Sequence, residues 1–350
     1  MKKQNLLLYV LLAISVAFTA CKKDDVVPLG KYQGGVLVVN EGSFGDGDGS
    51  ISFLSITDQT ITNAIFNAEN SQNIGGIVQN LKIHENKAIA ITNKADQIII
   101  ANATDFKKIS IISQADLVNP INFAGVGNKG YVTQWGATTD FVNYPDAAVR
   151  VVDLDAGTIT KTIALDAQPQ GILAYNNKIY VALQGSDKIV VINPSTDAIE
   201  ATITVAAGPS NLGVDANGKI WAMCTSGNFV RINPGDNTVE ATISGIKVNF
   251  FNEKFTFNKD KTKILYLSPA PFPSTDTEIF AMDITATAAP TTAFITGNNF
   301  YGLGVSPDDD VIYVANSAAF QGNGKVERYK ADGSKLDEFS AGRGTSNFVF

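Results

Sequence analysis

Residues that could catalyse a reaction or bind a metal ion are few and scattered in this chain of 350 residues. His84 is the only histidine, which excludes sites with several histidine ligands and disfavours a Ser-His-Asp triad. We expect His84 at a strand end beside a turn, in a solvated surface position. Asp46 and Asp48 in GDGDG (45–49) could supply oxygen ligands to calcium, but the remaining spaced acids of such a loop are missing, which favours a flexible turn. The sequence therefore indicates no catalytic residues, no metal site and no cofactor.

The two cysteines of the chain lie in different surroundings. Cys224 falls within KIWAMCTSG (219–227), where its place in a strand pattern indicates a small buried hydrophobic residue. Cys21 follows a segment with two early lysines, an apolar stretch (6–18) and two small residues, which is the order of a secretory signal peptide. The apolar stretch is shorter than the roughly 20 residues that span a bilayer. We therefore expect a cleaved signal and not a membrane helix.

The junction at Cys21 resembles the lipobox of bacterial lipoproteins, because it reads Phe-Thr-Ala-Cys. The resemblance implies a lipoprotein signal peptide (1–20) and a lipidated Cys21 at the start of a tether (21–34), followed by the folded domain (35–350). The alternative is an ordinary signal peptide with an incidental cysteine. The next residues, Lys-Lys-Asp-Asp, resemble the signal that exports lipoproteins of Bacteroidetes to the cell surface, or else form a solvated tether. The expected location is the outer membrane, anchored by lipid and facing the cell surface.

Composition bounds the remaining possibilities. Hydrophobic residues make up 45% of the chain and charged residues 17%, which indicates a folded, globular protein. The net charge is −7, and we find no basic stripe of the kind that binds phosphates, so nucleic acid is not an expected partner. We expect a monomer.

A repeat with a period of about 40 residues organises most of the chain. Residues 169–205 and 209–245 both read as a proline, a strand, an Asn-rich turn, a strand with Tyr or Trp, a loop, a strand ending Ile-Asn-Pro, a turn and a last strand. Four strands at this spacing are typical of a β-propeller blade. Further units at 77–112, 120–165, 252–296 and 300–340 bring the number of complete blades to six.

The two ends of the chain complement each other. Residues 36–66 supply the second, third and fourth strands of a blade, and the C-terminal GRGTSNFVF (342–350) matches a first strand with no successor. We therefore predict an all-β, seven-bladed β-propeller of four-stranded antiparallel blades, closed by the C-terminal strand joining the N-terminal blade. Closure predicts that Asn347 to Phe350 are buried and paired. The aromatic residues that recur in the second strands should pack in the core: Tyr131, Tyr180, Trp221, Tyr266 and Tyr313.

One face of such a propeller carries the long loops. In an antiparallel blade, the loop between the second and third strands and the link to the next blade lie on the same face. Four of the loops between second and third strands are long and carry aromatic residues, which suits ligand binding when a rigid scaffold presents them. The alternative is that these loops pack on the rim. The predicted ligand-binding residues are Phe44, Trp135, Phe141, Tyr144, Phe251, Phe272, Tyr301 and Phe320.

The opening GGVLVVNEGSFGDGDGSISFLSI and the repeated Pro…Tyr-Val-Ala…Val-Ile-Asn-Pro units resemble YncE-like propellers. More narrowly, the Asn40-Glu41-Gly42 start and its glycine-rich loop resemble the surface lipoprotein family of Bacteroidetes that includes the BtuG-type proteins. That resemblance implies capture of cobalamin or a related corrinoid at the cell surface, and transfer to a TonB-dependent outer-membrane transporter. A broad aromatic and amide-rich surface suits so large an amphipathic ligand.

Two other classes of function stay open at this point. Some propeller hydrolases of the lactonase type hold a metal ion with Asp, Glu and Asn on the propeller axis. A propeller can also bind proteins or glycans only. Our preferred prediction is a binding protein without enzymatic activity.

Overall fold

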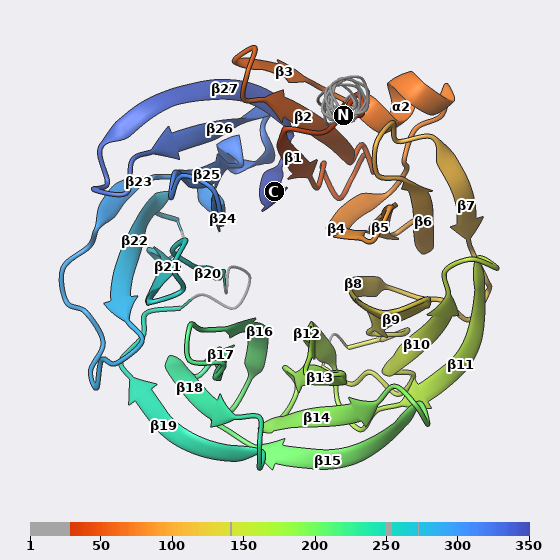
Figure 1. Ribbon diagram of the computed structural model, residues 1–350, viewed down its shortest axis with the longest axis vertical. Coiled ribbons are helices and arrows are strands. Elements are labelled where there is room, and N and C mark those ends of the chain that lie inside the picture. Colours follow the sequence, from red (N-terminus) through yellow and green to blue (C-terminus); the bar gives the residue numbers. More distant parts are fainter. Residues whose placement is uncertain (1–28, 141, 249–253, 272) are drawn as a thin grey trace, which may run out of the picture. The chain divides into compact units, whose positions relative to one another are not determined.

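The computed structural model describes residues 29–140, 142–248, 254–271 and 273–350. The expected signal peptide and Cys21 lie outside these residues. Lys31–Phe350 forms one compact unit with seven antiparallel sheets of four strands each, arranged as a ring (Figure 1). The predicted seven-bladed propeller is confirmed. No helix in the described part of the chain combines the length and the apolar character needed to cross a bilayer.

We number the blades in chain order, each from its innermost strand outwards. Blade 1 consists of β28 (Thr345–Val349), β1 (Gly35–Asn40), β2 (Ser50–Ser55) and β3 (Thr60–Thr62). Blade 2 consists of β4 (Ile77–His84), β5 (Lys87–Asn93), β6 (Gln97–Asn102) and β7 (Lys108–Ile112). Blade 3 consists of β8 (Pro120–Val126), β9 (Lys129–Gln134), β10 (Ala148–Asp153) and β11 (Thr158–Ala164). Blade 4 consists of β12 (Pro169–Tyr175), β13 (Lys178–Leu183), β14 (Lys188–Asn193) and β15 (Ala198–Thr204). Blade 5 consists of β16 (Pro209–Val214), β17 (Ile220–Cys224), β18 (Asn228–Asn233) and β19 (Thr238–Ser244). Blade 6 consists of β20 (Phe255–Phe257), β21 (Lys263–Pro269), β22 (Asp276–Asp283) and β23 (Ile295–Asn298). Blade 7 consists of β24 (Phe300–Val305), β25 (Ile312–Asn316), β26 (Asn323–Tyr329) and β27 (Lys335–Arg343).

The C-terminal strand closes the ring as predicted. β28 pairs antiparallel with β1, and Phe348 lies opposite Val38 in the register. Phe348 is buried, Asn347 and Val349 are half-buried, and Phe350 is 42% exposed and lies beyond the paired strand. The prediction of a buried and paired end is therefore wrong for Phe350, because the ladder to β1 ends at Val349.

The N-terminal blade differs from the prediction in its outermost strand. The stretch TITNAIF (60–66) forms only the three-residue strand β3, and the short helix α2 (Ile65–Asn70) follows it. Ala64 adopts a left-handed backbone conformation that turns the chain at this point. The turn buries Ile65 and Phe66 against Tyr32 and neighbouring residues of blades 1 and 2, which explains why they are apolar.

The core consists of seven hydrophobic clusters, one between each pair of neighbouring blades. Between blades 3 and 4, for example, Val149 and Val151 of β10 pack against Ile179 and Val181 of β13. Each such Val or Ile stabilises the fold by about 1.5–3 kcal/mol when fully buried. The cluster that holds Phe348 joins blade 7 to blade 1, so the C-terminal strand completes the last of these interfaces.

Residues assigned to packing from the sequence occupy the core. The five recurrent aromatic residues of the second strands are at most 2% exposed: Tyr131, Tyr180, Trp221, Tyr266 and Tyr313. Cys224 is fully buried, and burial raises the pKa of its thiol to about 12. His84 lies at the end of β4 beside a turn, as expected, but it is half-buried and its Nε2 lies 2.7 Å from the carbonyl oxygen of Gly127.

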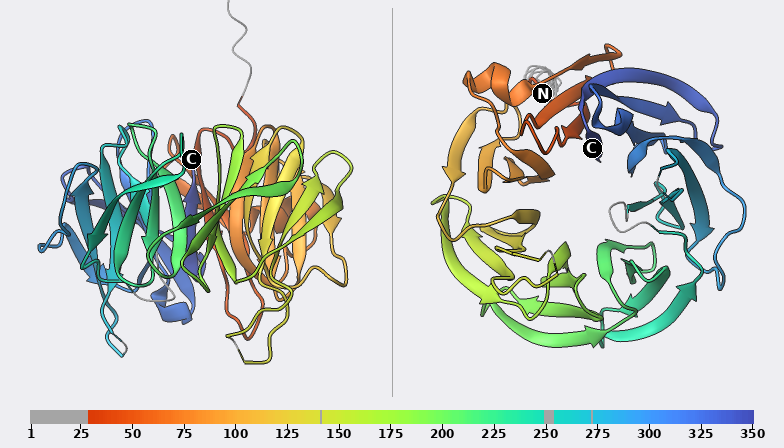
Figure 2. Two further views of the ribbon diagram at one scale, coloured as in Figure 1. Left: turned by 90° about the horizontal axis from the view of Figure 1, so that it is seen from below. Right: turned by 180° about the vertical axis from the view of Figure 1, so that it is seen from behind.

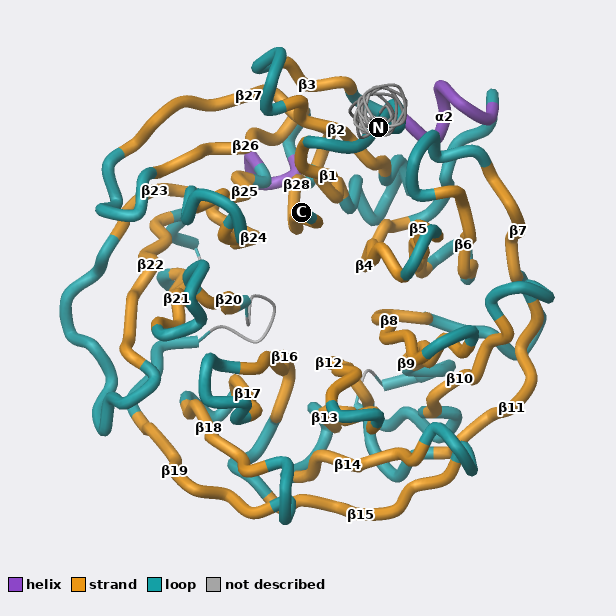
Figure 3. The backbone as a smooth tube through the Cα atoms, in the orientation of Figure 1, coloured by secondary structure: helices purple, strands orange, loops and turns teal. Residues whose placement is uncertain are grey.

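The long loops gather at one end of the ring, which we call the loop face (Figure 2). Second strands end and first strands begin at this face, and β1 begins at the opposite face with Gly35. Viewed along the axis, the first strand of each blade lies innermost in the ring (Figure 3). First strands of neighbouring blades come close at the axis: a Cβ added at Gly171 of β12 would lie 1.9 Å from the carbonyl oxygen of Ser210 on β16. The first strands therefore surround a narrow axial space.

Candidate functional site

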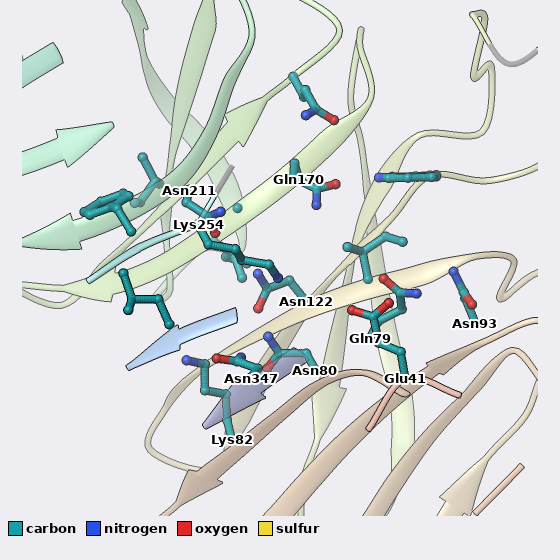
Figure 4. A pocket seen from close by; sticks show the side chains of 18 of the residues that line it. Glu41, Gln79, Asn80, Lys82, Asn93, Asn122, Gln170, Asn211, Lys254 and Asn347 are labelled. Atoms are coloured by element: carbon teal, nitrogen blue, oxygen red, sulfur yellow. The ribbon is translucent and has the colours of Figure 1, made fainter. Parts of the chain in front are cut away.

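A cavity of about 360 Å³ lies on the axis (Figure 4). Most of its lining residues lie where first strands begin and second strands end, which is the end of the ring at the loop face. Its wall is formed mainly by the first strands of all seven blades and by residues at the ends of second strands. Amide side chains dominate this wall: Gln79, Asn80, Asn93, Asn122, Gln170, Gln184, Asn211 and Asn347. In the described part of the chain, the charged residues of the lining are Glu41, Lys82 and Lys254.

The first strands present these amides through β-bulges. The register of each bulged strand shifts by one residue immediately before Asn80, Asn122, Asn211 and Asn347. A bulge adds one unpaired residue, bends the strand and redirects side chains, and such bulges are frequent next to binding sites. Repetition of the bulge around the ring brings asparagines from blades 1, 2, 3 and 5 to one axial position.

Three amide oxygens at the cavity are buried and have no hydrogen-bond partner among the described residues: Asn80 Oδ1, Asn93 Oδ1 and Gln170 Oε1. The Asn80 side chain belongs to a residue that is only 6% exposed. An unsatisfied buried acceptor costs about 1–3 kcal/mol. A ligand that donates N–H or O–H groups to these oxygens recovers that free energy, so the wall is suited to binding a polar ligand.

Glu41 contributes a carboxyl group to the cavity. It follows β1, is 9% exposed and accepts a hydrogen bond of 3.1 Å from the hydroxyl of Tyr301. Burial raises the pKa of this carboxyl, while the charge of Lys254 and hydrogen bonds from Tyr301 and Ser346 partly oppose the rise. Glu41 therefore holds a proton at higher pH than an ordinary glutamate.

Aromatic side chains line the entrance on two sides. Trp135 follows β9, and its Nε1–H donates a hydrogen bond of 2.8 Å to the carbonyl oxygen of Pro169 in the next blade, which fixes the indole. Tyr144 packs edge-to-face on Trp135 with ring centroids 5.7 Å apart. Phe320 packs in the same way on Tyr301 at 5.2 Å. Trp135 and Tyr301 line the cavity directly, with Tyr144 and Phe320 behind them.

One described residue of the predicted site, Phe44, lies away from the axial cavity. Phe44 is 78% exposed, stands outside the cavity lining and has the ammonium of Lys94 5.3 Å from its ring centroid. Phe141, Phe251 and Phe272 lie outside the described residues, so their ligand-binding role stays a prediction. Of the predicted residues, Trp135 and Tyr301 line the axial cavity, and their ligand-binding role also stays a prediction.

The acidic loop that suggested calcium binding is held by an arginine. Arg343 places Nη1 2.5 Å from Asp46 Oδ2 and 3.4 Å from Asp48 Oδ2, and its Nε donates to the carbonyl oxygen of Phe320 at 2.7 Å. The described residues contain no group of three or more His, Cys, Asp or Glu side chains placed to hold a metal ion. The positive charge beside Asp46 and Asp48 is thus supplied by the protein itself.

Sequence reasoning missed the amide side chains that surround the axial cavity, which we call the amide ring. The signal was present, because an asparagine follows the start of the first strand in PIN (120–122), PSN (209–211) and TSN (345–347). In a single blade this asparagine reads as an ordinary strand-edge residue. Only the closed ring shows that the repeated position faces the axis.

A wider groove of about 1140 Å³ lies on the loop face between blades 5 and 6. Its described lining includes Ile246, Val248 and Pro269, together with Lys247 and Glu278, whose charged groups pair at 3.9 Å. No buried polar atom of this lining lacks a partner, in contrast to the axial cavity. We therefore take the axial cavity as the candidate site.

The fold and cavity define a class: a closed seven-bladed β-propeller with a polar site on its axis. The sequence pattern of one family, described as a domain of unknown function (DUF5074), matches residues 34–345. The chain belongs to this family. None of the curated proteins matches the sequence.

Solved structures of other propellers are similar in fold. A quinonprotein alcohol dehydrogenase-like protein from Bacteroides thetaiotaomicron VPI-5482 has a TM-score of 0.68 at 15% identity, covering 91% of this chain and 78% of its own. A "putative 6-phosphogluconolactonase" from Bacteroides fragilis NCTC 9343 has a TM-score of 0.67 at 10% identity, covering 92% and 99%. A functionally unknown protein from Desulfotomaculum acetoxidans DSM 771 has a TM-score of 0.66 at 8% identity, covering 90% and 98%. At these identities the likeness shows the fold alone.

Proposed function

We propose that the protein is a cell-surface lipoprotein that captures a corrinoid at the mouth of its axial cavity and passes it to a TonB-dependent outer-membrane transporter. The observation that carries the proposal is the amide ring with its three unpartnered buried oxygens. A corrinoid bears carboxamide groups around its ring, and their N–H groups are the donors that such oxygens lack. The resemblance of the Asn40-Glu41-Gly42 start to the BtuG-type family favours the same ligand class.

The size of the cavity determines how such a ligand would bind. A volume of about 360 Å³ lies at the lower end for small-molecule sites, which span about 300–1,000 Å³, and a whole corrinoid does not fit inside it. The corrin ring would therefore lie across the mouth, against Trp135 and Tyr301, with amide arms reaching the inner wall. This pose uses both the aromatic entrance and the polar interior.

The position of the domain's entry point is compatible with a lipid tether. Gly35, the first residue of β1, is at the face opposite the cavity mouth, and Tyr32 packs there against Phe53 and Phe106. The folded unit therefore begins on the side away from the mouth. A segment of 14 residues spans at most about 50 Å, a reach that leaves room for the mouth to meet a transporter.

A calorimetric titration with cyanocobalamin tests the proposal. We expect binding to the purified protein at micromolar ligand and a loss of at least about tenfold in affinity, or roughly 1.4 kcal/mol, for Trp135→Ala. Tyr144→Ala, which removes the ring behind Trp135, should weaken binding less. The matched control is Phe44→Ala, an aromatic residue of the same face outside the cavity. Absence of binding to the unmodified protein would exclude corrinoids.

A hydrolase of the lactonase type is the alternative that the name of one structural neighbour suggests. The described lining of the axial cavity offers one carboxyl group, Glu41, beside two lysines, and this donor set suits an anionic or amide-bearing ligand better than a divalent metal ion. We therefore favour binding over turnover. Hydrolysis of 6-phosphogluconolactone at a rate above that of buffer, abolished by Glu41→Gln, would reverse this preference. A propeller that binds proteins or glycans only would ignore both small molecules.

A further inference from the structure

Two lysines contribute their ammonium groups to the lining of the axial cavity. Lys82 lies on β4, two residues beyond Asn80 and thus further from the mouth, and Lys254 directly precedes β20 on blade 6 (Figure 4). In the described part of the chain, neither ammonium group forms an ion pair, although most other lysines near the propeller surface do. Both side chains line the same cavity of about 360 Å³.

The surroundings disfavour the charged form of Lys82. The Lys82 side chain is exposed to the axial space, but the first strands enclose that space. The resulting desolvation, together with the charge of Lys254, lowers the pKa of the Lys82 ammonium group. Two like charges in one confined site repel each other, and an anion between them removes both the repulsion and part of the desolvation penalty. The described lining of the cavity therefore favours a bound anion.

Glu41 does not neutralise the pair. It is the one carboxyl group of the described lining, it is hydrogen-bonded to Tyr301, and its raised pKa favours the protonated form relative to an ordinary glutamate. With Glu41 ionised the lining carries a net charge of +1, and with Glu41 protonated +2, from two lysines and one glutamate. In either state one negative group improves the balance.

Amide donors complete the surroundings of the lysines. Asn80 lies on the same strand as Lys82, and β28, which carries Asn347, contacts β4. Asn122 and Asn211 approach from the other first strands (Figure 4). Ammonium groups and amide N–H groups together form a site suited to an oxyanion, because each oxygen of a phosphate ester accepts several hydrogen bonds.

We propose that Lys82 and Lys254 form an oxyanion subsite in the inner part of the axial cavity, which holds one phosphate ester group of the ligand. The inference deepens the proposed function and rests on it for the identity of the ligand. The subsite would make the protein selective among corrinoids. A corrinoid with the phosphodiester of a nucleotide loop should bind more tightly than a corrinoid that lacks this loop.

The first arm of the test uses inorganic phosphate as the probe, so it does not depend on the corrinoid. We expect calorimetry and thermal shift to detect phosphate binding to the unmodified protein, and Lys82→Met and Lys254→Met each to weaken it by about tenfold or more. Lys188→Met is the control, because Lys188 pairs with Asp166 on the rim at 2.6 Å and its loss changes the net charge equally. Lys82→Arg should restore most of the binding, which a merely structural role would not require.

The second arm compares cyanocobalamin with dicyanocobinamide, which lacks the nucleotide loop and its phosphate. The unmodified protein should bind cyanocobalamin at least about tenfold more tightly, and Lys82→Met should abolish this preference while its circular dichroism spectrum stays native. Equal affinity for the two corrinoids, with no phosphate binding, would overturn the subsite and leave the proposed function standing. Phosphate binding that depends on Lys82, without binding of either corrinoid, would support the subsite and refute corrinoid capture.

Discussion

Replacement of Phe348 by alanine tests the closure of the propeller. The ring of Phe348 is 7% exposed and packs with Val38, Leu54 and Tyr313 in the cluster between blades 7 and 1. Removal of a buried phenylalanine typically costs about 3–5 kcal/mol, because the apolar contacts are lost and a cavity remains. We expect about 3 kcal/mol here, since Phe348 lies on the innermost strand, beside the axial space into which neighbours can relax.

Phe350→Ala is the matched control, two residues away on the same segment. Phe350 is 42% exposed, lies beyond the paired residues of β28 and makes an edge-to-face contact with Tyr313 at 5.1 Å. Such a contact contributes about 0.5–1.5 kcal/mol, so the two variants should differ by about 2 kcal/mol. Urea unfolding followed by tryptophan fluorescence and by circular dichroism measures this difference.

Two outcomes would refute the reasoning. If Phe348→Ala and Phe350→Ala unfold at the same urea concentration, burial at this position does not stabilise the ring. If a chain ending at Gly344 unfolds like the full-length protein, β28 is not required for closure. We expect that truncated chain to aggregate, because the edge of β1 is then free to pair with another chain.

Three further predictions concern the site. Burial raises the pKa of Glu41 in the folded protein. The contribution of Glu41 to the free energy of unfolding is therefore fully present below its unfolded pKa of about 4.3, and it is lost as the pH rises through the folded pKa. Glu41→Gln should therefore gain stability relative to the unmodified protein between pH 4 and pH 8 in urea titrations, and a constant difference would contradict the burial argument. Arg343→Met should accelerate limited proteolysis of the loop at 40–50, because Asp46 then loses its partner, while stability changes by at most about 1 kcal/mol; unchanged cleavage would show that the ion pair does not hold the loop. Trp135→Phe, which keeps an aromatic ring but loses the hydrogen bond to the next blade, should bind cyanocobalamin more weakly than the unmodified protein, and equal affinity would show that the fixed indole orientation is unimportant.

The fold could be predicted from the sequence because each blade repeats a local pattern. Turn residues mark the strand ends, and apolar residues at alternate positions such as Ile189 and Val191 indicate the buried face of the sheet. Ring closure followed from counting strands at the two ends. The exception is residues 60–66, because an apolar pair such as Ile65 and Phe66 is buried equally well in a strand or in a short helix. In the structure, the left-handed backbone of Ala64 ends the extended segment and the helix α2 follows.

The site was less predictable, since its chemistry depends on the closed ring. Loop aromatics such as Phe44 and Trp135 look equivalent in sequence, yet one is exposed to solvent and the other is fixed by a hydrogen bond to a neighbouring blade. The axial asparagines of the first strands, Asn80, Asn122, Asn211 and Asn347, lie on four different blades and are far apart in the chain. In the sequence, Lys82 has the pattern of a solvent-facing residue on a strand. It lies on the axis because β4 is the innermost strand of blade 2.

The segment Asn40-Glu41-Gly42 links closure of the ring to the site. Asn40 is fully buried, and its Oδ1 accepts hydrogen bonds from the backbone N–H of Gly342 at 3.0 Å and the hydroxyl of Thr345 at 3.1 Å. Glu41 then enters the axial cavity, and Gly42 turns the chain with a φ of 82°, a conformation that favours glycine. The C-terminal strand that is held in this way also brings Asn347 to the cavity wall. Because the same contacts close the ring and complete the wall, a chain with an open ring has no axial site, and any ligand of this cavity stabilises the closed propeller by a free energy that grows with the logarithm of ligand concentration over Kd.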